Sequence, residues 1–193
     1  MSVEIQIKKD FGSFVLEVNF SSRDNRIGIL GASGCGKTMT LKCIAGIEKP
    51  DEGRIIIGDR VFFDSEKKIN LPARDRKIGY LFQNYALFPH MTVETNIGIG
   101  IREKGRKKEE KVKRLIEKFQ LGGLEKRYPS QLSGGQQQRT ALARILACEP
   151  DMILLDEPFS ALDGFLRENM QQEMLRILKG YEGNVLMVSH SRD

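Results

Sequence analysis

Eight residues at positions 31–38, GASGCGKT, have the residue types and spacing of a loop that binds phosphate. Glycines let the backbone turn its N–H groups toward an anion, and a helix that begins in the loop adds a favourable field for negative charge. We expect Lys37 to reach the β- and γ-phosphates of a nucleotide and the Thr38 hydroxyl to ligate Mg²⁺. The alternative is a glycine-rich turn with an incidental lysine, but an apolar run precedes this loop and a predicted helix follows it. The predicted nucleotide-binding residues here are Gly31, Ala32, Ser33, Gly34, Cys35, Gly36, Lys37 and Thr38.

A second stretch, MILLDEP at 152–158, supplies two adjacent acids after a run of apolar residues. An acid at the carboxyl end of a buried parallel strand lies where α/β folds bind ligands, so Asp156 is predicted to hold Mg²⁺. Glu157 follows it, and a carboxylate beside the metal ligand can orient or deprotonate an attacking water. The alternative is that both acids cap a following helix. Together with the glycine loop, they predict hydrolysis of a nucleotide.

A third stretch, LSGGQQQR at 132–139, opens another helix. Ser133 and Gln136 form a capping-box pattern, in which each side chain bonds to the other residue's backbone. The two glycines between them, Gly134 and Gly135, leave the first N–H groups of the helix bare, which makes a second surface for anions. Two helix starts of one chain can enclose the same γ-phosphate only if they lie close together. If the Ser133 turn lies out on the helical lobe, away from the glycine loop, it is most simply matched to the nucleotide of another copy of the chain.

The elements that must position these residues follow from the hydrophobic pattern. Apolar residues alternate with polar ones over 3–7 and 14–20, which predicts two antiparallel strands. The hairpin signal Gly58-Asp59 predicts two more strands, and 77–83 reads as another. Apolar runs that belong in the centre of a parallel sheet covered by helices are RIGIL (26–30), MILLD (152–156) and NVLMVSH (184–190).

Helices are predicted between and after these strands. Apolar residues recur at helical spacing around 112–119, 142–146 and 166–178, the last ending at Gly180, and no convincing strand lies between about 90 and 146. The fold class is therefore α/β: a mostly helical lobe inserted into a core with a doubly wound, mainly parallel sheet, preceded by antiparallel strands. We expect a single domain, with its nucleotide-binding core at 1–86 and 147–193 and its helical subdomain at 87–146.

Composition limits the class of protein. The 193 residues are 40% hydrophobic and 30% charged, which is typical of one globular domain. The net charge of +5 would suit an anionic partner, but bases and acids alternate, so a solvated surface is the first interpretation. Three cysteines without metal-ligand spacing predict reduced thiols. No apolar run reaches the ~18 residues of a membrane span and the start lacks a secretory signal, so a cytosolic location is expected.

With these motifs in this order, the whole chain resembles the nucleotide-binding subunit of ABC transporters. The resemblance implies a RecA-like P-loop NTPase core with an N-terminal antiparallel β subdomain and an inserted helical subdomain. The resemblance adds Gln83 as the Q-loop residue, SALD (160–163) as the D-loop and His190 as the switch histidine. It implies a head-to-tail homodimer in which ATP and Mg²⁺ lie between the glycine loop of one copy and the Ser133 turn of the other. Gln83 would sense Mg²⁺ and the γ-phosphate, His190 would contact that phosphate, and Asp163 would signal across the dimer.

The resemblance also implies that an aromatic residue between the first two predicted strands stacks on the adenine. Phe11, just before Gly12, is the predicted stacking residue. Phe14 is the competing candidate, but its alternation with Leu16 and Val18 favours a place in the core. His90 has no motif around it and is expected in a surface loop.

Within the family, residues 83–101 (QNYALFPHMTVETNIGIGI) resemble importers of oxyanions, metals, sugars and polyamines, where this region meets the permease. The segment 59–83 looks most like the molybdate-import subunit, although sulfate, iron and spermidine import stay open because the ATPase never touches the solute. The implied partners are integral membrane permease subunits and, indirectly, a solute-binding protein. The implied location is peripheral, on the cytoplasmic face of the membrane, with no nucleic acid bound.

Two other classes share parts of the pattern. A soluble ABC-type ATPase acting on nucleic acid or ribosomes would suit the positive charge but usually carries a coiled-coil insertion or a tandem cassette. A P-loop kinase or GTPase would not need the Ser133 turn. Because the family continues well beyond the switch histidine and this sequence ends three residues after His190, we expect the C-terminal part of the domain to be missing.

Overall fold

The structure is a computed structural model that describes residues 2–160 and 164–190. It divides into two compact units, one made of residues 1–80, 151–157 and 182–193 and the other of residues 81–150 and 158–181. The second unit includes the helix that follows the acidic motif as well as the helices around the Ser133 turn. The boundaries 87–146 for a helical subdomain stay a prediction.

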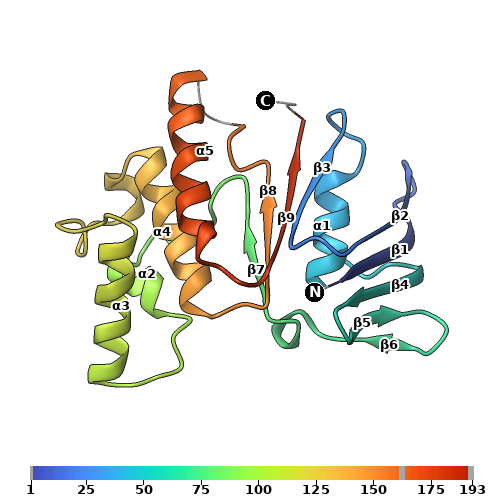
Figure 1. Cartoon of the computed structure of the whole chain (residues 1–193), viewed down its shortest axis with the longest axis horizontal. Coiled ribbons are helices and arrows are strands. Elements are labelled where there is room, and N and C mark those ends of the chain that lie inside the picture. Colours follow the sequence, from blue (N-terminus) through green and yellow to red (C-terminus); the bar gives the residue numbers. More distant parts are fainter. Residues whose placement is uncertain (1, 161–163, 191–193) are drawn as a thin grey trace. The chain divides into compact units, whose positions relative to one another are not determined.

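The first unit begins with a five-stranded antiparallel sheet in the order β2-β1-β4-β5-β6, drawn in blue to green in Figure 1. Alternate residues of the first strand, Val3, Ile5 and Ile7, are buried, as their spacing predicts. The turn at Gly58, with φ of 60°, joins the third and fourth of these strands and confirms the hairpin. The strands are β1 (Val3–Asp10), β2 (Val15–Ser22), β4 (Glu52–Ile57), β5 (Arg60–Asp64) and β6 (Ile69–Asn70).

A four-stranded sheet in the order β3-β9-β8-β7 completes the first unit, and its strands stand side by side in Figure 1. β9 pairs in parallel with both β3 and β8. All five residues of β8 are buried. Residues of both alternating sets are buried only where both faces of a sheet are covered. The strands are β3 (Arg26–Leu30), β7 (Ile78–Leu81), β8 (Met152–Asp156) and β9 (Asn184–Ser189).

The prediction of a central position for RIGIL is wrong. Within the described residues β3 lies at an edge of its sheet, its residues alternate between exposed and half-buried, and Leu30 is 57% exposed. An apolar run of five residues has the same composition whether one or two strands flank it. Strand order, which decides between these cases, is not written in the run itself.

The helix α1 (Lys37–Ala45) follows the glycine loop and ends at Gly46, which has φ of 79°. Its last turn is held by Arg76, a fully buried arginine whose guanidinium donates to the carbonyl oxygens of Cys43 and Ile44. The same guanidinium donates to the carbonyl oxygen of Leu71. One buried side chain therefore ties the end of α1 to the segment that follows the hairpin strands.

The second unit contains four α-helices among its described residues (Figure 1). Hydrophobic periodicity predicted three of them, and Gly180 follows the end of the last as expected. The connection before the first is organised by Asn96, whose buried amide bonds to the backbone of Phe88, Met91 and Thr92. The helices are α2 (Val93–Gly98), α3 (Arg106–Lys118), α4 (Gly134–Ala147) and α5 (Gly164–Lys179); the short 3-10 turns are η1 (Ala73–Asp75) and η2 (Pro129–Gln131).

Candidate functional site

The loop between β3 and α1 needs glycine at two positions. Gly34 and Gly36 have φ of 79° and 94°, in the left-handed region that other residues rarely adopt. A Cβ on Gly36 would also lie 2.5 Å from a methyl carbon of Leu16. The loop is fixed at its start by the N–H of Gly31, which donates to the carbonyl of Ser189 at the end of β9. Its conformation is therefore set by both backbone freedom and packing.

Lys37 turns its ammonium back into this loop. Its Nζ donates to the carbonyl oxygens of Gly31 and Ala32 at 2.8 and 2.9 Å, and its side chain is only 5% exposed. A buried ammonium needs hydrogen-bond acceptors or a counter-charge. Here it also has the Glu157 carboxylate 3.6 Å away. The cation is thus held in the loop by the first unit itself.

The Asp156 carboxylate at the end of β8 accepts hydrogen bonds from two hydroxyl groups. Thr38, in the first turn of α1, donates to Oδ1 at 2.9 Å, and Tyr80, on β7, donates to Oδ2 at 2.9 Å. Burial first, and then the neighbouring Asp156 charge, raise the pKa of Tyr80 above its ordinary value. The phenol therefore stays protonated and is a donor at neutral pH.

Glu157 lies between two basic groups. Its Oε1 is 3.6 Å from Lys37 Nζ and its Oε2 is 3.2 Å from Nδ1 of His190, which follows β9. The residue has φ of 45°, an unfavourable conformation for a residue with a side chain, and its N–H donates to the carbonyl of Val188. The strained turn aims the carboxylate into the space shared by the lysine and the histidine.

The first unit has the groups that a nucleotide triphosphate and Mg²⁺ require. The N-cap of α1 is Gly36, which offers no side-chain cap, so the first N–H groups of the helix are suited to phosphate oxygens. The Thr38 hydroxyl and the Asp156 carboxylate, 2.9 Å apart, are oxygen ligands of the kind Mg²⁺ takes. Among the described residues no group of three or more His, Cys, Asp or Glu could form a metal cage.

The two aromatic rings near the start of β2 lie against each other. Phe11 and Phe14 are stacked with ring centroids 5.0 Å apart and 13° between their planes. Phe14 is 38% exposed and precedes the first residue of β2, so its predicted place in the core is wrong. The strand alternation begins only with the following residues. Lys9 Nζ lies 5.7 Å from the centre of the Phe11 ring.

In the second unit, the Ser133 turn has the predicted capping box. The Ser133 hydroxyl accepts from the N–H of Gln136, and the Gln136 amide oxygen accepts from the N–H of Ser133. Nothing lies within 4 Å of a Cβ built on Gly134, and a Cβ built on Gly135 would meet only Met170, with the sulfur 3.3 Å away. The turn is thus locally complete and presents an open helix start.

Gln83 and the loop after it also belong to the second unit. The Gln83 amide nitrogen donates to the hydroxyl of Ser160 at 3.0 Å. Tyr85 and Ala86 both have positive φ, and their carbonyls accept from the Arg144 guanidinium of α4. An arginine on the helix of the Ser133 turn therefore holds the strained loop. Asp163 lies outside the described residues, and His90 is exposed in a loop, as predicted.

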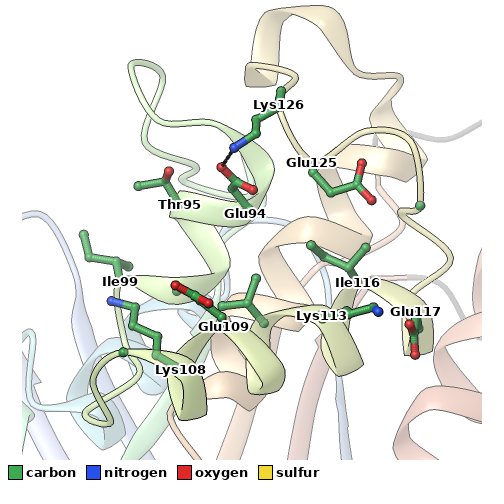
Figure 2. Close-up of a pocket in the computed structure, with 14 residues that line it drawn as sticks. Glu94, Thr95, Ile99, Lys108, Glu109, Lys113, Ile116, Glu117, Glu125 and Lys126 are labelled. Carbon is green, nitrogen blue, oxygen red and sulfur yellow. Dashed lines mark hydrogen bonds and ion pairs between the residues drawn. The ribbon is translucent and has the colours of Figure 1, made fainter.

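A groove of about 1030 Å³ lies between α2 and α3 (Figure 2). The residues that line it include the apolar Ile99, Val112 and Ile116, and Lys126 forms an ion pair with Glu94. Lysines and glutamates are also among its lining residues. The groove includes part of the segment 83–101 that the resemblance marks for partner binding.

One family model matches most of this chain. The family model described as ABC transporter matches residues 16–160, from β2 to Ser160. The chain belongs to the ABC transporter family. The match includes the glycine loop, the Ser133 turn and the acidic pair of this ABC domain.

Relatives of the ABC domain include import proteins. It is 42% identical to the sulfate/thiosulfate import ATP-binding protein CysA of Halalkalibacterium halodurans, covering 100% of this chain and 56% of that protein. It is 48% identical to the Fe(3+) ions import ATP-binding protein FbpC of Haemophilus influenzae, covering 92% and 51%. The chain therefore spans about half the length of these relatives.

Among solved structures, the ABC domain is similar to the ATP-binding cassette MJ0796, in a dimeric post-hydrolysis state bound to ADP and Pi. The TM-score is 0.77 at 29% identity, covering 99% of this chain and 88% of the other. This similarity confirms the predicted fold class, a P-loop NTPase core with a parallel sheet and an antiparallel N-terminal sheet. Within 2–160 and 164–190, no helix has both the length and the hydrophobicity to cross a bilayer.

Two contacts of the ABC domain were not predicted from sequence. Tyr80 was read only as part of a strand, although it bonds to the predicted metal ligand Asp156. Ser160, the partner of Gln83, was read only as part of SALD. The one signal that could have suggested Tyr80 is a tyrosine on a predicted strand of the sheet that also carries the acidic pair.

Proposed function

We propose that this ABC domain binds and hydrolyses ATP as part of an importer. The observation that carries the proposal is the meeting of Lys37, Thr38, Asp156, Glu157 and His190 around the uncapped start of α1. In this proposal the helix start and Lys37 bind the β- and γ-phosphates. A bound Mg²⁺ would supply further positive charge for the phosphate oxygens.

The residues that would hold Mg²⁺ are Thr38, Asp156 and the Q-loop residue Gln83. In the hydrolysis step, the oxygen of a water attacks the γ-phosphorus and the bond to the β–γ bridging oxygen breaks. Glu157 accepts the proton of that water, and ADP and phosphate are released. His190, whose Nδ1 is 3.2 Å from Glu157, keeps the carboxylate oriented and contacts the γ-phosphate.

We further propose that two copies assemble head to tail. The open helix start at Ser133, Gly134, Gly135 and Gln136 would then close over the ATP bound to the glycine loop of the partner, with Asp163 at the interface. The similar cassette with a dimeric ADP-bound structure supports this arrangement. Phe11, with Phe14 stacked on it, offers the adenine an aromatic surface.

The proposed membrane partner is a permease that binds segment 83–101 and the adjoining α2–α3 groove, placing the domain on the cytoplasmic face. The importer relatives support this partner, and a solute-binding protein would act with the permease. For the solute we propose a small oxyanion, with molybdate as the first candidate because segment 59–83 resembles molybdate-import subunits. Purifying the native chain and identifying the membrane protein that accompanies it tests the proposed permease partner. Recovery of nucleic acid in place of a membrane protein would contradict that partner.

The test of hydrolysis is Glu157→Gln, with the exposed Glu182→Gln as a matched control. We expect turnover of the first variant to fall at least about 100-fold, since it loses the proton acceptor. Its Kd for ATP should change by less than about threefold, because Lys37 keeps its acceptors in the loop, the carbonyls of Gly31 and Ala32, and the helix start is unaltered. ATP should trap this variant as a dimer. A hydrolysis rate equal to that of the control would remove Glu157 from this role.

A further inference from the structure

The hydroxyl of Tyr80 lies on the acid that the proposed function assigns to Mg²⁺. We propose that Tyr80 is a positioning residue that fixes the Asp156 carboxylate in the orientation needed for metal binding, an inference that rests on the proposed ATP site. Tyr80 itself would not touch the metal. It would act only through Asp156.

The first argument is geometric. Tyr80 lies on β7 and Asp156 at the end of the neighbouring strand β8, and the phenol oxygen is 2.9 Å from Oδ2. Thr38 holds the other oxygen, Oδ1, from the first turn of α1, also at 2.9 Å. Each carboxylate oxygen is therefore held by a different element, and rotation of the group about its Cβ–Cγ bond would break both hydrogen bonds.

The second argument concerns the direction of the hydrogen bond. An ionised carboxylate can only accept, so the phenol must donate its proton to Oδ2. A phenol is protonated at neutral pH, so it has the proton that this hydrogen bond needs. The bond is thus a fixed feature of the site, and one that a phenylalanine of nearly the same shape could not make.

The third argument is energetic. Groups that orient a metal ligand without touching the metal commonly change metal affinity or activity by about 10–100-fold when they are removed. Asp156 is 5% exposed, so few other donors can replace the phenol. We therefore expect Tyr80→Phe to weaken binding of the divalent cation about tenfold while leaving the phosphate-binding loop unchanged.

The experiment titrates Mn²⁺ into protein saturated with a non-hydrolysable ATP analogue and measures free Mn²⁺ by electron paramagnetic resonance. Tyr80→Phe should need about tenfold more Mn²⁺ for half-saturation. The control is Tyr181→Phe, which removes another phenol hydrogen bond, to the carbonyl of Pro150, away from the acid. Tyr80→Met, which also lacks the hydroxyl, should match Tyr80→Phe. In EDTA, analogue affinity should be unchanged in all three variants.

The outcomes separate this inference from the proposed function. If the unaltered protein binds no Mn²⁺–nucleotide, both fall. If it does, and Tyr80→Phe binds Mn²⁺ as tightly as the Tyr181→Phe control, the role of Tyr80 is overturned while the ATP site stands. A lower melting temperature in EDTA with unchanged Mn²⁺ affinity would likewise reduce Tyr80 to a packing residue and overturn the inference.

Discussion

Replacing the buried Arg76 by methionine should destabilise the protein through unpaired carbonyls. The guanidinium donates at 2.7 Å to Ile44, at 2.8 Å to Leu71 and at 2.9 Å to Cys43. The Cys43 carbonyl keeps a second donor, the N–H of Gly46. The carbonyls of Ile44 and Leu71 would lose their guanidinium partner inside the protein.

The size of the effect follows from these two acceptors. A buried acceptor left without a partner costs about 1–3 kcal/mol, so the two together cost about 2–6 kcal/mol. Burial lowers the pKa of Arg76 to about 10, which shows that burying this charge itself has a cost, and methionine avoids that cost. The net loss should therefore lie near the lower end, at about 2–3 kcal/mol, which is a large part of a typical stability of about 5–15 kcal/mol.

Urea unfolding monitored by circular dichroism measures this change, and the melting temperature should fall by about 4–12 °C. The control is Arg74→Met, because the Arg74 side chain is in the same 3-10 turn but 86% exposed. Surface substitutions of this kind change stability by less than about 0.5 kcal/mol. If the two variants unfold within about 0.5 kcal/mol of each other, the guanidinium contacts do not stabilise α1 as argued.

Two further predictions concern the helix starts. Gly36→Ala should lower the free energy of unfolding by about 1–3 kcal/mol, measured by thermal unfolding, and weaken ATP binding, because Gly36 has a positive φ and a methyl of Leu16 lies close to it. The control Gly28→Ala, which has open space around it, should change neither. Ser133→Ala should cost about 1 kcal/mol in urea unfolding by loss of the cap. Ser133→Asp should retain the cap but abolish ATP-dependent dimerisation seen by light scattering, and retained dimerisation would contradict a phosphate-facing role for this helix start.

Much of the site could be predicted because its signals are local. The spacing of glycines in 31–38 requires only that a strand precede the loop and a helix follow it, and both do. The Ser133–Gln136 capping box joins residues three positions apart, so its geometry is contained in the sequence. Hydrophobic periodicity gave the helices α3, α4 and α5 for the same reason, since side chains on one helical face are sequence neighbours.

Other features could not be predicted because they depend on which strands become neighbours. The run RIGIL reads as a central strand, yet β3 has a partner on one side only within the described residues. The alternation that placed Phe14 in the core begins one residue too late to include it, and its ring stacks on Phe11 instead. The order of apolar residues in a segment predicts which of its faces is apolar, but not which other part of the chain covers that face.

The sequence by itself determined the chemistry of this protein: a phosphate-binding loop, an acidic pair after a buried strand, and another helix start that is closed by a capping box. Tertiary structure alone decided which side chains meet at that chemistry. Tyr80 and Asp156 are 76 positions apart, and they share a hydrogen bond only because β7 and β8 are neighbours in the sheet. Local patterns fix conformation over a few residues, whereas contacts between distant residues are fixed by strand order and packing, to which the whole chain contributes.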